Sequence, residues 1–218
     1  MKKSLVIFDL DGTLVNSIHD LGNAANHALQ KFGYPTHELS AYRFMVGNGV
    51  KALLRRALPE EERLDDVIAR LMDDFKDFYN EHLTDYTKPY PGIEALLTEL
   101  NSREINIAVL SNKYQAAVES IVRQLFPDIR FAALMGNVDG IPAKPDPSGV
   151  FQILTACPTP KADVLYVGDS GIDMDTARRA AVDSVGVTWG FRPRRELEDH
   201  YADTIVTAPA DILPLLDA

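Results

Sequence analysis

The segment formed by residues 6–15 constrains the fold more than any other part of the chain. Its apolar start ends abruptly in two carboxylates, Asp9 and Asp11, followed by Gly12. We expect residues 4–8 to form a buried strand of a mostly parallel α/β sheet, in which ligands gather beyond the carboxyl ends of the strands. Both carboxylates would then stand at the ligand-binding edge, and Gly12 would allow a sharp turn or a close approach of the backbone.

From residue 90 onward, helical and strand patterns alternate along the chain. The predicted strands are residues 105–110, 131–135, 164–167, 184–188 and 204–206, and the predicted helices are residues 93–100, 115–125, 148–156 and 174–181. Strands that alternate with helices imply right-handed crossovers and a parallel sheet covered on both faces. We therefore predict an α/β fold with a Rossmann-like parallel sheet core.

Residues 16–87 lack strand patterns and carry helical periodicity nearly throughout. We predict an inserted all-helical domain here, with helices at 21–32, 50–58 and 64–83. The apolar stripe of the last helix is expected to form its core: Leu64, Val67, Ile68, Leu71, Met72, Phe75, Phe78 and Tyr79. The α/β core would then comprise residues 1–15 and 88–218, with hinges near residues 15–17 and 84–89.

Composition narrows the class of partner. The formal net charge is −10, from 32 acidic and 22 basic residues, which argues against a nucleic-acid surface. Apolar runs fall far short of the ~20 residues that cross a bilayer, and Asp9 comes too early for a signal peptide, so a cytoplasmic protein without membrane contact is expected. Cys157 is the single cysteine and is interpreted as a structural thiol.

Polar groups follow four of the expected strands or loops at the same edge of the sheet. They are Asp9-Leu10-Asp11-Gly12-Thr13, Ser111-Asn112-Lys113, Lys144-Pro145 and Gly168-Asp169 with Asp173 four residues on. Each has an ordinary interpretation by itself: Ser111 as a helix cap, Lys144 as a solvated loop lysine, and Asp169 with Asp173 as helix caps. Their coincidence at one edge is more informative than any one of them.

In this order, the four motifs resemble the haloacid dehalogenase-like superfamily of phosphohydrolases, over the whole chain. The resemblance implies a Rossmann-like core with a four-helix cap formed by the insert. Two further segments are similar to the phosphoglycolate phosphatases of that family. They are Val46-Gly47-Asn48-Gly49, with Leu53-Leu54 and Ala57-Leu58 after it, and Val187-Thr188-Trp189-Gly190-Phe191.

The resemblance implies a role for each motif residue. Asp9 would be the nucleophile that forms an aspartyl-phosphate, and Asp11 the general acid and then the general base. Ser111 and Lys144 would hold the phosphoryl oxygens. The remaining substrate contacts are expected from Leu10, Asn112, Gly47 and Asn48.

Magnesium is the cofactor that the resemblance implies, and its preference for oxygen ligands suits carboxylates. Asp9 and Asp169 would bind it through their carboxylates and Asp11 through its backbone carbonyl. Asp173 would orient metal-bound water or Lys144, or bind the metal itself as a weaker ligand, and Thr13 would support these groups. A metal ion with Lys144 would also explain how an acidic protein accepts an anionic substrate.

The expected function is magnesium-dependent hydrolysis of a small phosphorylated metabolite, with phosphoglycolate as first candidate, by a monomer or homodimer. A phosphosugar mutase resembling β-phosphoglucomutase, a pyrophosphatase or nucleotidase of the same superfamily, and a catalytically idle binding protein remain alternatives. Dehalogenation is disfavoured because Asp11 is kept.

The chain departs from the family pattern at two positions. Asn16 stands where many relatives have an aspartate, and Val182 stands where a glycine is common, which is expected to change how the preceding helix ends. No catalytic role is expected for the five histidines, which share no metal-ligand spacing: His19, His27, His37, His82 and His200.

Overall fold

The computed structural model describes residues 2–217, which divide into two compact units. The α/β unit comprises Met1–Asn16 and Pro89–Ala218, and the helical unit comprises Ser17–Lys88. The predicted boundaries, at residues 15/16 and 87/88, lie one residue from these. Among the described residues, no helix combines the length and the apolar character that spanning a membrane requires.

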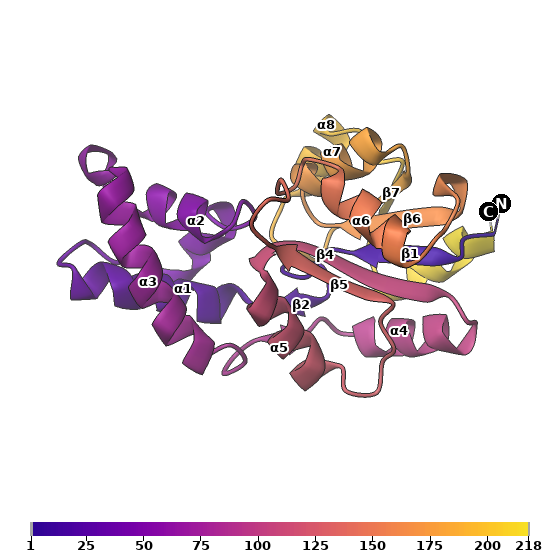
Figure 1. The fold of residues 1–218 in the computed structure, drawn as a ribbon, viewed down its shortest axis with the longest axis horizontal. Coiled ribbons are helices and arrows are strands. Elements are labelled where there is room, and N and C mark those ends of the chain that lie inside the picture. The colour runs from indigo at the N-terminus through magenta and orange to yellow at the C-terminus, as the bar shows by residue number, and fades with distance from the viewer. Residues whose placement is uncertain (1, 218) are drawn as a thin grey trace. The chain divides into compact units, whose positions relative to one another are not determined.

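A six-stranded parallel sheet forms the centre of the α/β unit (Figure 1), which confirms the predicted sheet. Its strands are β1 (Leu5–Phe8), β4 (Asn106–Tyr114), β5 (Ala133–Asn137), β6 (Val164–Gly168), β7 (Asp183–Val187) and β8 (Thr204–Val206). The order β5-β4-β1-β6-β7-β8 places β1 in the middle of the sheet. Its ends therefore meet neighbours on both sides.

Helices cover both faces of this sheet. They are α4 (Ile93–Ser102), α5 (Gln115–Leu125), α6 (Ser148–Ala156), α7 (Gly171–Ala180) and α8 (Arg194–Asp199), with short 3₁₀-helices at Lys161–Asp163 and Pro209–Asp217. In Figure 1, α4 and α5 lie on one face and α6, α7 and α8 on the other. Because side chains alternate along a strand, Leu5 and Ile7 of β1 join one buried cluster with Val150 of α6 and Ala177 of α7.

The register of the central strands brings three chain segments to one edge. Phe8 of β1 pairs with Val109 of β4 on one side and with Val167 of β6 on the other. The Asp9 N–H continues this pairing by donating a 2.9 Å hydrogen bond to the Val167 carbonyl. The residues that follow these positions therefore leave the sheet side by side, as expected for parallel strands.

The second strand-end motif does not lie where it was predicted. The strand predicted to end at residue 110 continues in β4 to Tyr114, so Ser111 and Lys113 lie within its last residues. The extension is possible because the pairing of β4 with β5 shifts register between Leu110 and Tyr114, where Tyr114 pairs with Asn137. An irregular strand end of this kind leaves no signal in hydrophobic periodicity.

Helix α7 also differs from its prediction at both ends. It begins at Gly171, three residues before the predicted start at residue 174. At its other end Ala181 adopts the left-handed conformation, with φ of 57°, before Val182. For a residue with a Cβ atom this conformation costs about 1 kcal/mol, so the altered helix end expected at Val182 is present and strained.

The helical unit contains α1 (Ile18–Lys31), α2 (Val50–Ala57) and α3 (Asp65–Glu81), with 3₁₀-helices at Leu39–Phe44 and Glu60–Glu62. These helices are compatible with the four-helix cap that the resemblance implies, although the helix between α1 and α2 is a six-residue 3₁₀-helix, which lies before the glycine-containing loop at 47–49.

The apolar stripe of α3 is buried at Val67, Ile68, Leu71, Phe75 and Tyr79. Met72 and Phe78 are partly buried. Leu64, however, is 57% exposed, so its predicted place in the core is wrong. Its backbone is extended because it is the N-cap of α3, outside the helical face.

The segments that link the units are ordered. The short strands β2 (Val15–Asn16) and β3 (Lys88–Pro89) pair as a two-stranded sheet, which the hydrophobic pattern did not predict. Within the helical unit, the carboxylate of Asp20 accepts hydrogen bonds from the backbone N–H groups of Tyr86 and Thr87. This buried carboxylate therefore fixes the chain just before β3.

Candidate active site

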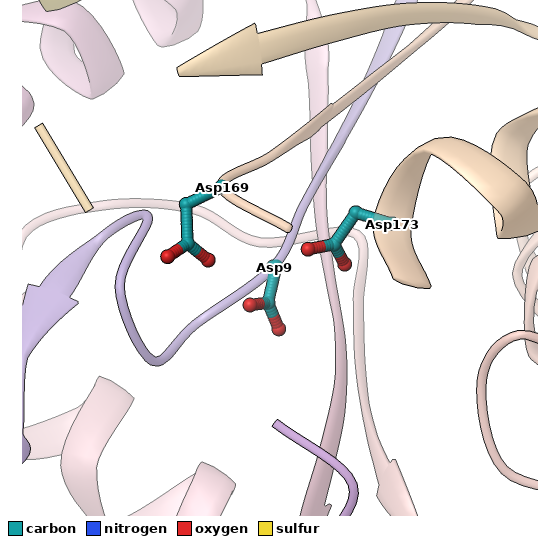
Figure 2. Close-up of side chains that lie close together, drawn as sticks. All are labelled: Asp9, Asp169 and Asp173. Carbon is teal, nitrogen blue, oxygen red and sulfur yellow. The ribbon is translucent and has the colours of Figure 1, made fainter. Parts of the chain in front are cut away.

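Three buried carboxylates gather beyond the ends of β1 and β6. One oxygen from each of Asp9, Asp169 and Asp173 lies within 4.8 Å of the others. Figure 2 shows the carboxylates of Asp169 and Asp173 on either side of Asp9. Asp9 and Asp169 follow directly after their strands, and Asp173 lies in the first turn of α7. Three like charges in so small a buried space repel one another unless a cation joins them.

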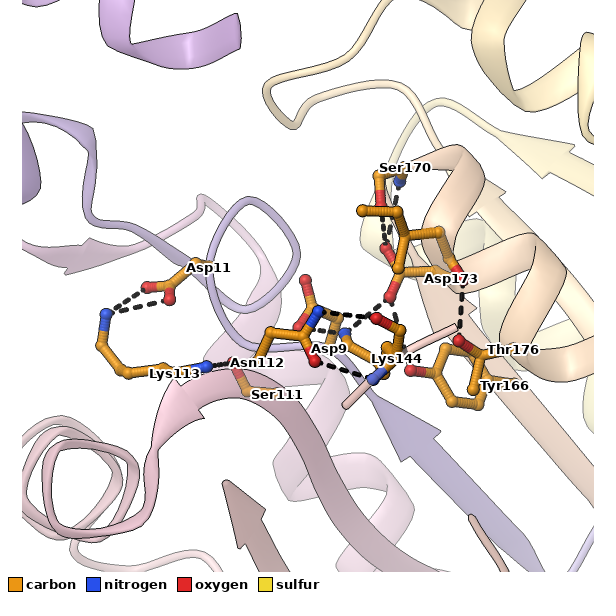
Figure 3. Close-up of polar contacts among 11 residues, drawn as sticks. Asp9, Asp11, Ser111, Asn112, Lys113, Lys144, Tyr166, Ser170, Asp173 and Thr176 are labelled. Atoms are coloured by element: carbon orange, nitrogen blue, oxygen red, sulfur yellow. Dashed lines mark hydrogen bonds and ion pairs between the residues drawn. The ribbon is translucent and has the colours of Figure 1, made fainter. Parts of the chain in front are cut away.

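Lys144 is the cation that bonds to this cluster (Figure 3). Its buried ammonium donates 2.7 Å hydrogen bonds to Asp9 Oδ1 and to Asp173 Oδ1. Burial by itself lowers the pKa of Lys144, but the carboxylates of Asp173 and Asp9 outweigh it and hold that pKa well above its ordinary value. The lysine is therefore a fixed positive charge at the site.

Even so, the carboxylates outnumber this cation. Burial raises the pKa of Asp9 from 3.8 to about 7; Lys144 opposes the rise, and Asp173 adds to it. Burial also raises the pKa of Asp169 well above its usual range, and the charges of Asp173 and Asp9 raise it further. Strongly perturbed carboxyl groups in one cluster are typical of functional sites.

The excess of carboxylates over positive charge in the cluster indicates whether these residues could hold a metal ion. A set of buried carboxylate oxygens with excess negative charge, converging within 4.8 Å, fits a hard divalent cation such as Mg²⁺. A bound divalent cation would oppose both the burial and the repulsion that raise the pKa values of Asp9 and Asp169. The donor set is therefore compatible with the predicted cofactor.

Asp173 serves both the helix and the cluster. Its Oδ2 accepts hydrogen bonds from the Ser170 hydroxyl, at 2.6 Å, and from the Ser170 N–H, at 3.1 Å. The second of these bonds is one half of a capping box at the start of α7, and the other half joins the Asp173 N–H to the Ser170 side chain. Its Oδ1 accepts the bond from Lys144, and the Tyr166 hydroxyl donates to the same oxygen at 3.4 Å. These bonds orient Lys144 and support a positioning role for Asp173.

Asp169 lies in a cradle made by two glycines. A Cβ atom at Gly12 would come within 2.4 Å of Asp169 Oδ2, and one at Gly190 within 2.3 Å of Asp169 Cβ. The Phe191 N–H donates a 2.7 Å hydrogen bond to Asp169 Oδ2, and the Trp189 indole N–H donates to the Thr13 carbonyl at 3.0 Å. The loop after β7 therefore fixes Asp169.

No role in the site was predicted for residues 189–191 from the sequence. The available signal was a glycine between two aromatic residues directly after a strand.

Thr13, predicted to support the site, is fully buried, and its hydroxyl makes no hydrogen bond within the described part of the chain. Leu10 is also fully buried, so we expect any substrate contact there to come from its main chain.

Ser111 and Asn112 lie in the last residues of β4, both buried. The Ser111 hydroxyl accepts a 3.2 Å hydrogen bond from the Lys113 N–H. The Asn112 side chain binds the main chain of Lys144 in both directions, donating to its carbonyl at 3.1 Å and accepting from its N–H at 2.9 Å. This places the Lys144 loop against β4, a positioning function beside the predicted substrate contact of Asn112.

Asp11 forms an ion pair with Lys113. The Lys113 ammonium donates to Asp11 Oδ1 at 3.0 Å and to Oδ2 at 2.9 Å. In Figure 3 the Asp11 carboxylate is turned toward Lys113 and away from Asp9. Lys113 belongs to the Ser111-Asn112-Lys113 motif, but no role was predicted for it. A side chain that follows a strand cannot be placed from periodicity alone.

Gly47 and Asn48 belong to the helical unit, in the loop before α2. Gly47 has a φ of 110°, which favours glycine. Arg56 fixes this loop by donating hydrogen bonds to Asn48 Oδ1 at 2.6 Å and to the Met45 carbonyl at 2.8 Å. Their contact with substrate stays a prediction.

Comparison with known proteins agrees with this geometry. The family model of haloacid dehalogenase-like hydrolases matches residues 6–187. A phosphoglycolate phosphatase from Pseudomonas putida is 33% identical over 96% of this chain and 78% of its own length. One from Mannheimia succiniciproducens is 31% identical over 97% of both chains.

A solved structure shares the fold over nearly its whole length. It is described as a predicted phosphoglycolate phosphatase from Haemophilus somnus, and it matches with a TM-score of 0.91 and 28% identity, covering 99% of this chain and 98% of its own. The family model spans most of the α/β unit, including every residue of the carboxylate cluster. The chain therefore belongs to the haloacid dehalogenase-like hydrolase family and is a phosphatase of that family.

Proposed function

We propose that this protein hydrolyses a small phosphomonoester with Mg²⁺ by forming an aspartyl-phosphate on Asp9, and that phosphoglycolate is the first candidate substrate. The observation that carries the proposal is the position of Asp9: its carboxylate is buried between two further carboxylates and bonded to Lys144. A nucleophile in a phosphoryl-transfer site needs this combination of fixed geometry and local positive charge.

In the first step, the ionised carboxylate of Asp9 attacks phosphorus. The bond from phosphorus to the ester oxygen breaks, and Asp11 gives a proton to the departing oxygen, so the free alcohol leaves. In the second step, Asp11 takes a proton from a water molecule that attacks the same phosphorus. A bond forms from phosphorus to the water oxygen and the bond from phosphorus to the Asp9 oxygen breaks, so inorganic phosphate leaves and the Asp9 carboxylate is restored.

Asp9 can attack phosphorus only when its carboxyl group is ionised, and ionisation depends on positive charge beside it. Because its pKa is raised to about 7, the carboxyl is half protonated at neutral pH when no further cation is present. The carboxylates of Asp9 and Asp169 and the carbonyl of Asp11 would hold Mg²⁺, which when bound supplies positive charge beside the nucleophile and the phosphoryl oxygens. Lys144 contributes a permanent positive charge through its hydrogen bond to Asp9.

The remaining residues bind and orient the phosphoryl group. The hydroxyl of Ser111 and the ammonium of Lys144 would donate hydrogen bonds to its oxygens. Asp173 orients Lys144, and the glycine cradle orients Asp169. Support for phosphoglycolate comes from the names of the Pseudomonas putida and Mannheimia succiniciproducens relatives, and from the likeness of the Gly47-Asn48 loop to that group.

A phosphate-release panel with Mg²⁺ tests the proposal. It includes phosphoglycolate, p-nitrophenyl phosphate, sugar phosphates, pyrophosphate and nucleotides, so that the pyrophosphatase and nucleotidase alternatives are covered. Interconversion of sugar 1- and 6-phosphates without net phosphate release is followed separately and would decide for the mutase alternative. We expect phosphoglycolate to give the highest kcat/KM, and Asp9→Asn to abolish turnover. Asp128→Asn, which changes an exposed aspartate of the same unit, is the matched control. Phosphate release by Asp9→Asn at a substantial fraction of the wild-type rate would contradict the nucleophile assignment.

A further inference from the structure

A second buried lysine, Lys113, lies beside Asp11 and has no role in the proposed reaction steps. The side chain of Lys113 is 3% exposed, and its ammonium donates hydrogen bonds to both carboxylate oxygens of Asp11. Lys144 bonds instead to Asp9 and Asp173. The two lysines therefore stand beside different carboxylates, one at the nucleophile and one at the general acid.

The proposed chemistry requires Asp11 to change partners. To protonate the leaving oxygen, one oxygen of its carboxyl group must come within hydrogen-bond distance of that atom. Both oxygens now accept bonds from Lys113, so at least one of these bonds is given up in the reactive arrangement. A buried ammonium that loses an anionic partner is costly unless another anion replaces it.

The position of Lys113 indicates where that second anion would be. Its ammonium lies 2.9 Å and 3.0 Å from the oxygens of Asp11. An Asp11 oxygen bonded to the leaving oxygen would itself be about 3 Å from it. An acidic group one carbon away from the leaving oxygen would therefore lie within reach of the Lys113 side chain, since that side chain is long and flexible.

We propose that Lys113 binds a carboxylate on the alcohol part of the substrate and is the residue that selects phosphomonoesters of 2-hydroxycarboxylic acids. This inference rests on the proposed function, because it takes Asp11 as the group beside the leaving oxygen. The substrate carboxylate replaces Asp11 as a partner of Lys113 and leaves Asp11 to bond to the leaving oxygen. A substrate without the carboxylate would weaken the Lys113–Asp11 pair without supplying a new anion to Lys113.

The experiment tests whether a preference for a carboxylate on the substrate depends on the Lys113 side chain. Wild type, Lys113→Met and Lys113→Arg are each assayed with phosphoglycolate and with phosphoglycolamide, in which a neutral amide of the same shape replaces the carboxylate. Because the Lys113 variants also disturb Asp11, both substrates are expected to lose kcat. The diagnostic quantity is the ratio of the two kcat/KM values.

Wild type should prefer phosphoglycolate, and Lys113→Met should reduce this preference by about tenfold or more, mostly through KM for the carboxylate substrate. Lys113→Arg keeps the positive charge and should retain most of the preference. Lys161→Met, which removes an exposed lysine of the same unit, is the control and should leave the ratio unchanged.

An unchanged ratio in Lys113→Met, or a wild-type enzyme that hydrolyses both substrates equally well, would overturn the inference and leave the proposed function standing. Failure of the wild type on every phosphomonoester would instead contradict the proposed function. If Lys113→Met does not fold, Lys113→Gln carries the same test, because its neutral amide also removes the charge. Retention of the full preference in that variant would overturn the inference.

Discussion

Both units contain buried aspartates, but the partners of these aspartates differ between the units. In the helical unit, Asp20 accepts hydrogen bonds from two backbone N–H groups and from the Thr87 hydroxyl, and Asp74 pairs with Lys31. In the α/β unit, Asp9, Asp169 and Asp173 crowd together, and Lys144 bonds to two of them. The pKa values of Asp9 and Asp169 are raised in consequence, first by burial and then by neighbouring charge.

The difference separates carboxylates that hold the fold together from the carboxylates that we propose act in the reaction. A buried acid whose bonds are matched within its own unit stabilises a local structure, as Asp20 does for the chain at Tyr86 and Thr87. A buried cluster with too much negative charge destabilises the protein and is retained for what it binds. The comparison predicts opposite outcomes for similar substitutions in the two units.

The largest expected effect is on turnover. Asp9→Asn should lower kcat by about 10⁴-fold or more, because the amide cannot attack phosphorus, while the protein stays folded. Asp20→Asn should leave kcat for p-nitrophenyl phosphate within about threefold of wild type at temperatures where it is folded. Steady-state assays and circular dichroism of both variants check this, and comparable kcat losses in the two would break the comparison.

The next effect comes from the cradle of Asp169. Gly190→Ala places a Cβ atom 2.3 Å from Asp169 Cβ and 2.4 Å from the Gly12 carbonyl oxygen, so Asp169 must move. We expect kcat/KM to fall by about 10²-fold and the Mg²⁺ concentration for half-maximal activity to rise. Gly140→Ala is the control for backbone strain away from the site, because this loop glycine has open space around its Cβ position but a φ of 85° that strains an alanine. A normal magnesium dependence in Gly190→Ala would show that the loop after β7 does not fix Asp169.

Stability should respond most strongly in the helical unit. Asp20→Asn replaces a charged acceptor of three hydrogen bonds and should lower the free energy of unfolding by about 1–3 kcal/mol. Chemical denaturation at pH 8 measures this. An Asp20→Asn variant as stable as wild type would mean that the carboxylate does not hold the segment before β3.

Substitution of Asp9 should change stability in the opposite direction to substitution of Asp20, by an amount that depends on pH. Its folded pKa of about 7 lies above the ordinary value of 3.8, so the folded state favours the protonated form. The metal-free protein therefore loses stability as the pH rises through this interval, and the loss is complete above pH 7. Asp9→Asn, which cannot ionise, should stabilise the metal-free protein by at most about 4 kcal/mol at pH 8 and by much less near pH 4. Thermal unfolding with a chelator, at the two pH values, checks the sign; a smaller gain at pH 8 than at pH 4 would contradict it.

The smallest effect is expected at the end of α7, away from the cluster. Ala181 has a φ of 57°, which glycine adopts without steric cost. Ala181→Gly should therefore raise the free energy of unfolding by about 0.5 kcal/mol and leave kcat unchanged. A destabilised variant in chemical denaturation would show that the left-handed conformation carries no strain there.

Much of the fold and the acidic cluster could be predicted because parallel strands end at one edge. The positions of Asp9 and Asp169 follow from strands that their apolar residues identify. Lys113 and the loop at Trp189 could not be placed in this way. The first depends on a register shift beyond Leu110, and the second on how a loop folds back over Gly12, and neither has a periodic signature. The six-residue 3₁₀-helix after α1 was missed for the same reason.

The most direct test of the central claim is detection of the phosphoryl group on Asp9. Asp11→Asn should slow hydrolysis of the intermediate more than its formation from p-nitrophenyl phosphate, whose leaving group needs little protonation. Acid quenching followed by peptide mass spectrometry should then show one added phosphoryl group on Asp9 when Mg²⁺ is present, and none in Asp9→Asn. Release of p-nitrophenol without any phosphorylated Asp9, or with the phosphoryl group on another residue, would contradict the account.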